Sequence, residues 1–210
     1  MIHLTVSGVK KAYGFKTVFR DLSFEWNDEI CAIAGPNGSG KSTLMQCLTG
    51  LEKITAGTVR WDVDGQSLSP AEVRANIGYV APYIQLYEEL TALENLNFLL
   101  GLSRTEPHRE WTNILEQFQL PKILEQPYGT LSTGQQQRVK LAAAAIRKPR
   151  ILCLDEPGSN LDSHGIELVH QFVMESHQRG AMVLIASNNP DELAWCSRRV
   201  DLHPVEETLS

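Results

Sequence analysis

The sequence predicts an α/β fold with a mostly parallel core sheet. Three short apolar runs, 30–34, 151–154 and 181–186, lead straight into glycine-rich or polar residues, and segments with helical spacing lie between them. Continuous apolar runs indicate strands that are covered on both faces, which is typical of parallel sheets with crossover helices. Ligands bind at the carboxyl ends of such strands, so we expect the functional site where the three runs end.

The N-terminal stretch predicts strands of a different kind. Residues 2–9 alternate apolar and polar side chains, and Phe24 and Trp26 continue in the same style. Alternation with a period of two is typical of a strand with one buried face. We therefore predict half-buried strands ahead of the first apolar run.

The middle of the chain predicts a helical insertion. Helical spacing with polar faces is present in 90–102, 110–118 and 121–125, and no strand of any length separates these segments. A chain of 210 residues fits one domain with an inserted part. The predicted division of the single domain 1–210 is a catalytic core of 1–82 and 135–210 and a helical subdomain of 83–134.

Composition and charge exclude several classes of function. The formal net charge of -6 leaves no global attraction to nucleic acid, so we expect no such partner. No apolar run approaches the roughly 20 residues that span a bilayer, so any membrane partner is a separate chain. The four cysteines, Cys31, Cys47, Cys153 and Cys196, lack metal-ligand spacing and are interpreted as reduced core residues of a cytosolic protein.

A glycine-rich loop between the first apolar run and a helical segment is the strongest motif. It follows the pattern Gly-x-x-x-x-Gly-Lys-Ser, in which backbone N–H groups surround phosphates. Lys41 supplies a charge for the β- and γ-phosphates, and Ser42 an oxygen for Mg²⁺. The alternative, an accidental glycine-rich turn, does not account for the strand before the loop and the helix after it. The predicted phosphate-binding residues are Gly35, Pro36, Asn37, Gly38, Ser39, Gly40, Lys41, Ser42 and Thr43.

Two adjacent carboxylates end the second apolar run. Asp155 has the chemistry to hold Mg²⁺, and Glu156 to orient and polarise an attacking water. The alternative is that the pair only ends a strand and caps the next element. Together with a phosphate loop upstream, the pair predicts hydrolysis of ATP with Mg²⁺ as cofactor.

A third motif lies at 131–139, where polar residues precede a strongly helical run. Ser132 is a good N-cap, so one interpretation is a capped helix. The functional interpretation is a second helix N-terminus that is offered to a phosphate.

The order of these motifs resembles the ATP-binding-cassette (ABC) ATPases over essentially the whole chain. Residues 35–43 resemble the family's phosphate loop, 151–156 its Mg²⁺-binding strand with the catalytic glutamate, and 159–162 the loop that follows. Tyr13 lies where the family stacks an aromatic ring on adenine, although an ordinary surface tyrosine is the alternative. The family's signature pentapeptide and following loop correspond here to Leu131, Ser132, Thr133, Gly134, Gln135 and Asp162.

The resemblance implies a fold, an assembly and partners. The implied fold is that of an ABC-type P-loop NTPase: an α/β core with a mostly parallel sheet, an antiparallel N-terminal β part and an inserted α-helical subdomain. The implied assembly is a head-to-tail homodimer, or a heterodimer with a second ABC ATPase, with two ATPs at the interface. The partners are integral-membrane permease subunits, which would keep the chain cytoplasmic and peripheral on the inner face of the cell membrane.

Three positions depart from the family's pattern. The coupling glutamine aligns with Pro82, which has no side-chain oxygen, so Gln85 is the candidate replacement as a Mg²⁺ contact. The histidine near the γ-phosphate aligns with Asn188, whose amide can donate a hydrogen bond but cannot accept a proton. Thr133 replaces the first signature glycine, and its branched side chain narrows the space near the partner's nucleotide.

Two functions are compatible with these residues. The first is the ATP-hydrolysing subunit of a membrane transporter, with Glu156, Lys41 and Asn188 as catalytic residues. The alternative is a non-transport ABC protein that acts as an ATP-gated dimerising switch or scaffold with weak hydrolysis. The presence of Glu156 favours the first.

Overall fold

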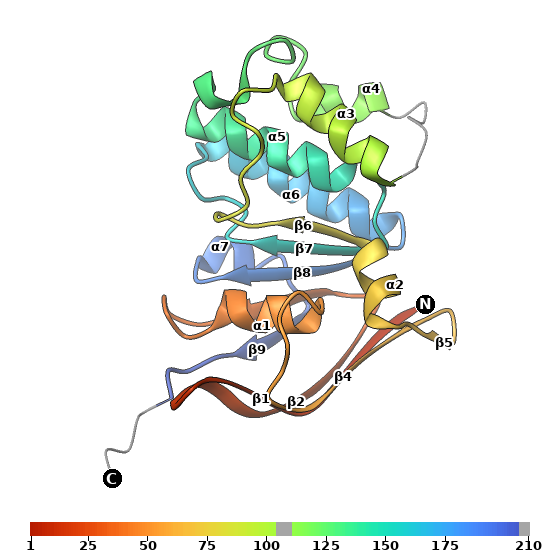
Figure 1. The fold of residues 1–210 in the computed structure, drawn as a ribbon, viewed down its shortest axis with the longest axis vertical. Helices are drawn as coiled ribbons and strands as arrows, with labels where there is room; N and C mark the ends of the chain where they lie inside the picture. The colour runs from red at the N-terminus through yellow and green to blue at the C-terminus, as the bar shows by residue number, and fades with distance from the viewer. Residues whose placement is uncertain (104–110, 206–210) are drawn as a thin grey trace.

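The computed structural model describes residues 1–103 and 111–205. Its elements form layers (Figure 1): a parallel sheet has α5 and α6 on one face and α1 on the other, and an antiparallel sheet lies beyond α1. The α/β fold with its parallel core and antiparallel N-terminal part is therefore confirmed. None of the helices in the described ranges has the length and apolar character of a membrane span.

The parallel sheet has the strand order β6-β7-β8-β3-β9. Its register pairs Asp155 with Ala186 and Ala34 with Ser187, so the polar residues that end β7, β8 and β3 lie at the same edge. The first two apolar runs are strands as expected, and the third begins one residue later. The bounds are β3 Ile30–Ala34, β6 Ile77–Val80, β7 Ile151–Asp155, β8 Met182–Ser187 and β9 Arg198–Asp201.

The antiparallel sheet has the order β2-β1-β4-β5 and contains the predicted half-buried strands. In β1 the residues Ile2, Leu4 and Val6 are buried, and the residues between them are partly exposed, which matches the alternation in the sequence. The pairing of β1 with both neighbours makes this sheet a curved cover over α1 (Figure 1). The bounds are β1 Ile2–Tyr13, β2 Lys16–Asn27, β4 Ala56–Val63 and β5 Gln66–Ser67.

Seven α-helices are described, and α3 and α4 form the layer farthest from the sheets (Figure 1). The expectation of helix at 121–125 is wrong, because these residues form consecutive turns. The carbonyl oxygens of Leu124 and Gln126 accept bonds from the N–H groups of Leu93 and Ala92, which satisfies the start of α3. The bounds are α1 Lys41–Leu48, α2 Pro70–Ala75, α3 Ala92–Ser103, α4 Trp111–Gln117, α5 Thr133–Ala145, α6 Ser163–Gln178 and α7 Pro190–Leu193.

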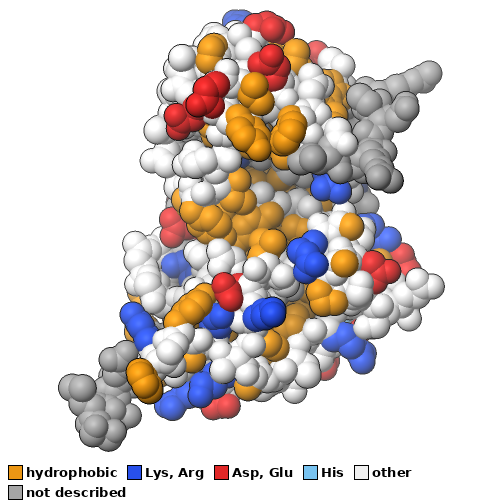
Figure 2. All heavy atoms as spheres, viewed as in Figure 1, with side chains coloured by type: hydrophobic (Ala, Val, Ile, Leu, Met, Phe, Trp, Pro, Cys, Tyr) orange, Lys and Arg blue, Asp and Glu red, His pale blue; other side chains and the backbone are white. Residues whose placement is uncertain are grey.

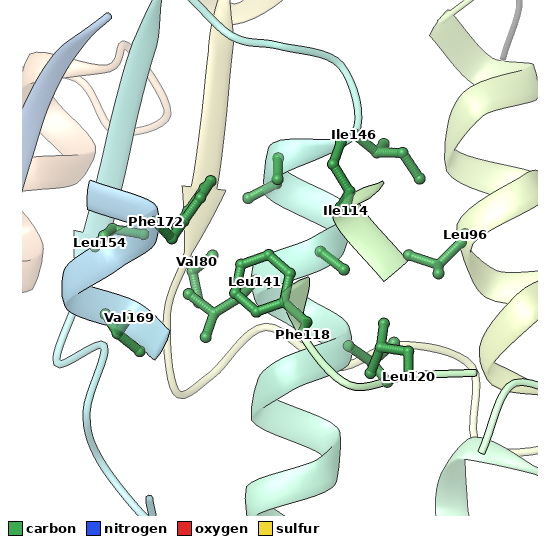
Figure 3. Packing of buried hydrophobic residues seen from close by; sticks show 14 of the residues in the cluster. Val80, Leu96, Ile114, Phe118, Leu120, Leu141, Ile146, Leu154, Val169 and Phe172 are labelled. Carbon is green, nitrogen blue, oxygen red and sulfur yellow. The ribbon is translucent and has the colours of Figure 1, made fainter. Parts of the chain in front are cut away.

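The apolar core joins the helical layer to the parallel sheet. Figure 3 shows Phe118, just after α4, packed with Leu141 of α5 and Val80 of β6. The rings of Phe118 and Phe172 meet edge to face at 5.2 Å. Burial of each such ring stabilises the fold by about 2–3 kcal/mol. One continuous cluster thus links α3 and α4 to the strands that carry the site.

Candidate nucleotide site

The phosphate loop leaves β3 and enters α1 with glycine at two positions where no other residue fits. Gly35 has a φ of 152°, and a Cβ there would lie 2.4 Å from the carbonyl oxygen of Leu202. Gly40 has a φ of 98°, and its Cβ would lie 2.5 Å from Val18. The loop is therefore pressed against β2 and the end of β9, which fixes its curvature.

Lys41 holds its charge inside the loop. The side chain is buried, and Nζ donates hydrogen bonds to the carbonyl oxygens of Gly35 at 3.0 Å and Pro36 at 3.2 Å. The first turn of α1 contains no acidic residue, so no carboxylate there competes for the ammonium group. The loop therefore presents a cation and a helix N-terminus to an anion.

Asp155 is a buried carboxylate without a well-placed donor. Neither of its oxygens has a hydrogen-bond partner of good geometry among the described residues. Burial raises the pKa of Asp155, as does the charge of Glu156, whereas the nearby Ser42 hydroxyl and Lys41 lower it. An orphaned carboxylate beside a hydroxyl fits a bound divalent cation, so the residues present suit Mg²⁺.

Glu156 has an unusual backbone conformation. Its φ is 48°, a left-handed value that costs a residue with a Cβ about 1–3 kcal/mol. Its N–H donates to the carbonyl oxygen of Ala186 at 2.8 Å, which anchors it on the neighbouring strand β8. The side chain lines the same cavity as Lys41 and Ser42.

Asn188, at the end of β8, contacts the phosphate loop directly. Its Nδ2 donates a hydrogen bond to Oδ1 of Asn37 at 2.9 Å. The residue that aligns with the family's histidine therefore lies beside the loop, as an uncharged donor.

Residues of the phosphate loop and Glu156 line one cavity of about 800 Å³. Tyr13 lines it at the far end of β1, half exposed, with the ammonium group of Lys11 4.2 Å from its ring centroid. Five lining residues were not predicted, because nothing in the local pattern links the start of β2 or the chain after β9 to the phosphate loop: Lys16, Thr17, Val18, Pro204 and Val205. The lining comprises Tyr13, Lys16, Thr17, Val18, Asn37, Gly38, Gly40, Lys41, Ser42, Thr43, Glu156, Pro204 and Val205.

The signature residues line a different hollow, of about 420 Å³. Ser132 caps α5 in a reciprocal pair of hydrogen bonds with Gln135, and both Ser132 and Thr133 are exposed. Asp162 also lies here, where it caps α6 by accepting the N–H of Gly165 at 2.8 Å. The structure therefore does not bring these residues to the phosphate loop of the same chain.

Comparisons with known proteins show the family of this chain. The family model described as ABC transporter matches residues 19–159. The chain belongs to the ABC transporter family. It is similar to the lipoprotein-releasing system ATP-binding protein LolD of Bacteroides thetaiotaomicron, with 32% identity over 98% of each chain. It is also similar to the maltose/maltodextrin import ATP-binding protein MalK of Yersinia pestis, with 36% identity over 78% of this chain and 45% of MalK.

Solved structures of the family have the same fold. The chain is similar to the dimeric ATP-binding cassette MJ0796 in a post-hydrolysis state bound to ADP and Pi, with a TM-score of 0.83 and 27% identity over 95% of this chain and 94% of that one. It is also similar to an ATP-binding subunit of an ABC transporter, with a TM-score of 0.84, 27% identity and coverage of 95% and 85%. The chain is accordingly an ATPase of the ABC family.

One expected site residue of this ABC ATPase lies elsewhere. Gln85 is exposed and lines a groove between β6 and α3, not the cavity with Lys41 and Ser42. The turn at Pro82 instead places the side chain of Tyr83 beside α1. Its hydroxyl forms hydrogen bonds with Nε2 of Gln46 and with the hydroxyl of Tyr79, both at 2.7 Å. The role expected for Gln85 as a Mg²⁺ contact therefore has no support in this structure.

Proposed function

We propose that the chain hydrolyses ATP as part of a head-to-tail dimer and powers a transporter whose membrane-spanning subunits are separate chains. The observation that carries this proposal is the separation of two half-sites. Lys41 and Glu156 line one cavity, with Asp155 near Lys41 and Ser42, whereas Ser132 and its neighbours line another hollow. A second copy, or another ATPase of the family, would complete each site.

The phosphates of ATP fit the loop between β3 and α1. Lys41 now bonds to two loop carbonyls, and it would exchange them for β- and γ-phosphate oxygens. Ser42 and Asp155 would hold Mg²⁺, which supplies positive charge against the phosphate oxygens when bound. Binding in this way gives the buried carboxylate of Asp155 the partner that it lacks.

Glu156 suits the role of general base. Its carboxylate would accept a proton from a water whose oxygen attacks the γ-phosphorus as the bond to ADP breaks. Asn188 would donate its amide hydrogen to a γ-phosphate oxygen, in place of its present bond to Asn37. An uncharged donor stabilises developing negative charge less than an imidazolium, so we expect slow hydrolysis that depends on Glu156.

The exposed end of α5 supplies the second half-site. Ser132 and Thr133 stand at its N-terminus, where N–H groups and the helix dipole favour a phosphate. Gly134 has little free space, since a Cβ there would lie 3.3 Å from the carbonyl oxygen of Asn160. Hydrogen bonds from this end to the γ-phosphate of a partner's ATP would stabilise the dimer until hydrolysis.

An apolar groove suits the membrane-spanning partner. Hydrophobic side chains gather in a hollow at mid-height of the face in Figure 2. A groove of about 450 Å³ between β6, α3 and α5 includes Tyr87 and Phe98, which are 54% and 43% exposed and meet edge to face at 5.3 Å. Exposed aromatic clusters of this kind are typical of protein interfaces. Docking here would hold the chain at the inner face of the cell membrane.

The test compares a variant that traps the ATP-bound dimer with a matched control variant that cannot bind the phosphates. Glu156→Gln should bind ATP without hydrolysing it, so light scattering should detect a dimer with ATP and a monomer without it. The double variant Lys41→Ala with Glu156→Gln lacks the phosphate contact and should stay monomeric. Copurification of the trapped protein from membranes should recover a chain with several apolar stretches of about 20 residues.

The outcomes separate the alternatives. A Glu156→Gln protein that remains monomeric with ATP contradicts the shared site. A wild-type protein that dimerises with ATP but shows no turnover supports an ATP-gated switch or scaffold instead. If the protein hydrolyses ATP but no membrane-spanning chain copurifies with it, the transport function is contradicted and the ATPase function is not.

A further inference from the structure

Glu192 is a buried carboxylate that none of the steps above uses. It lies in the short helix α7, just after Asn188, and is 3% exposed. Burial of a carboxylate is costly unless specific donors compensate it. Its partners therefore indicate why an acid occupies this position.

The principal partner is the loop that carries Glu156. Oε1 of Glu192 accepts the backbone N–H of Gly158 at 2.9 Å. A Cβ at position 158 would lie 2.4 Å from the same oxygen, so a larger residue there would force the carboxylate to move. Burial raises the pKa of Glu192, the Ser187 hydroxyl and the Gly158 N–H lower it, and the charge of Glu156 raises it.

The loop is held from its other side as well. Nε2 of the buried Gln137, on α5, donates to the carbonyl oxygen of Pro157 at 3.0 Å. Within the loop, the N–H of Ser159 bonds to the carbonyl oxygen of Glu156 at 3.1 Å. Glu192 and Gln137 thus hold the N–H and the carbonyl oxygen of one peptide unit, Pro157–Gly158, which follows the residue with the left-handed backbone.

We propose that Glu192 is a positioning residue that holds Glu156 in its strained orientation, by accepting the N–H of Gly158. This inference rests on the proposed role of Glu156 in hydrolysis. A left-handed residue at the end of a strand relaxes unless surrounding contacts hold it. Glu192 and Asn188 both follow β8. The hydrogen bond from Gly158 to Glu192 therefore also links the loop of Glu156 to the segment that contacts the phosphate loop.

The test compares two substitutions of similar size. Glu192→Gln keeps a side-chain oxygen that can accept from Gly158, whereas Glu192→Met fills the space without a comparable acceptor. Displacement of a catalytic group by about 1 Å lowers turnover on the order of 100-fold. We expect Glu192→Met to lower kcat by about 10- to 100-fold with KM for ATP nearly unchanged, and Glu192→Gln to restore most of kcat.

Two further measurements keep folding and function apart. Hydrogen exchange of the peptide covering 155–161 should accelerate in Glu192→Met and not in Glu192→Gln, with ATP affinity retained in both. Asp191→Ala removes the exposed neighbouring carboxylate of the same helix and serves as the control. If Glu192→Met does not fold, Glu192→Asp keeps the charge but shortens the reach, and it should show the same loss of kcat.

Wild-type turnover with unchanged exchange of 155–161 in Glu192→Met overturns the inference. Equal loss of kcat in the Gln and Met variants also overturns it, because the acceptor would then not be what matters. If the wild-type protein itself lacks turnover, the proposed function fails, and the exchange measurement still decides whether Glu192 holds the loop.

Discussion

The side-chain amide of Asn188 donates a 2.9 Å hydrogen bond to the side-chain oxygen of Asn37. This bond joins the end of β8 to the phosphate loop across 151 residues of sequence. It also shows that the Asn188 donor is within reach of the loop where phosphates bind. A γ-phosphate oxygen is a better acceptor than an amide oxygen, because it is charged.

Asn188→Ala should therefore slow ATP hydrolysis. Loss of a hydrogen bond to a charged group costs about 1.5–3 kcal/mol, so we expect kcat to fall by about 10- to 100-fold. Steady-state phosphate release measures it, with Asp191→Ala as the control on the exposed side of the same segment. Unchanged turnover in Asn188→Ala would refute the contact with phosphate.

Asp155→Asn should abolish Mg²⁺-dependent hydrolysis and yet stabilise the nucleotide-free protein. Burial raises the pKa of Asp155, so the fold disfavours its charged form, and this cost to stability disappears as the pH falls and acid protonates the group. A neutral amide removes an unsatisfied buried charge, which is worth about 1–3 kcal/mol. Denaturant titration without Mg²⁺ measures the gain at pH 7.

Ser42→Ala is the matched variant for this prediction. It also removes an oxygen for Mg²⁺ but leaves the carboxylate in place, so hydrolysis should fall without any gain in stability. A less stable Asp155→Asn protein would mean that the carboxylate has partners that compensate its burial.

The thiols of the folded chain should react slowly. Burial raises the pKa of Cys47 to about 11 and, together with the charge of Glu192, that of Cys196 to about 12. Because the thiolate is the nucleophile, its fraction at pH 8 falls to about one in a thousand or less. Mass spectrometry after iodoacetamide treatment should find little labelling of the native protein and four labels after unfolding. Rapid labelling of Cys47 in the native protein would contradict its burial.

Tyr13 should contribute to binding of the base and not of the phosphates. Lys11 covers one face of its ring, so the other face is the one available for stacking. Tyr13→Ala should weaken ATP binding by about 10-fold, in line with about 1–3 kcal/mol per stacked base, and Tyr13→Phe should not. Calorimetry with inorganic tripolyphosphate is the control, because its affinity should be the same in all three proteins. A parallel loss for tripolyphosphate would indicate a disturbed loop.

Local patterns predicted the parts of the site that are contiguous in sequence. The apolar run 30–34 followed by glycines predicted the strand and the phosphate loop, and the run 151–154 predicted the strand that ends at Asp155. In both cases burial on two faces and the turn chemistry are encoded within a few residues. The cap at Ser132 was predictable for the same reason.

The parts that depend on distant contacts were not predictable. Helical spacing at 121–125 is overridden because the carbonyl oxygens of Leu124 and of Gln126, just after it, accept hydrogen bonds from the start of α3. Gln85 lies in the groove between β6 and α3, because the turn at Pro82 places Tyr83 beside Gln46 instead. Glu192 has the pattern of an ordinary acid on a short helix, and its role emerges only from the loop that packs against it.

The closeness of Gly35 to the end of β9 has a practical consequence for protein production. The N–H of Leu202 bonds to the carbonyl oxygen of Ala34 at 2.7 Å, and Pro204 and Val205 then run along the nucleotide cavity. An affinity tag after Ser210 would thus follow, within a few residues, a segment that lines that cavity. A tag at the amino end, where Met1 lies beside Asp64 at the end of β1 remote from Tyr13, is the better choice for ATP titrations.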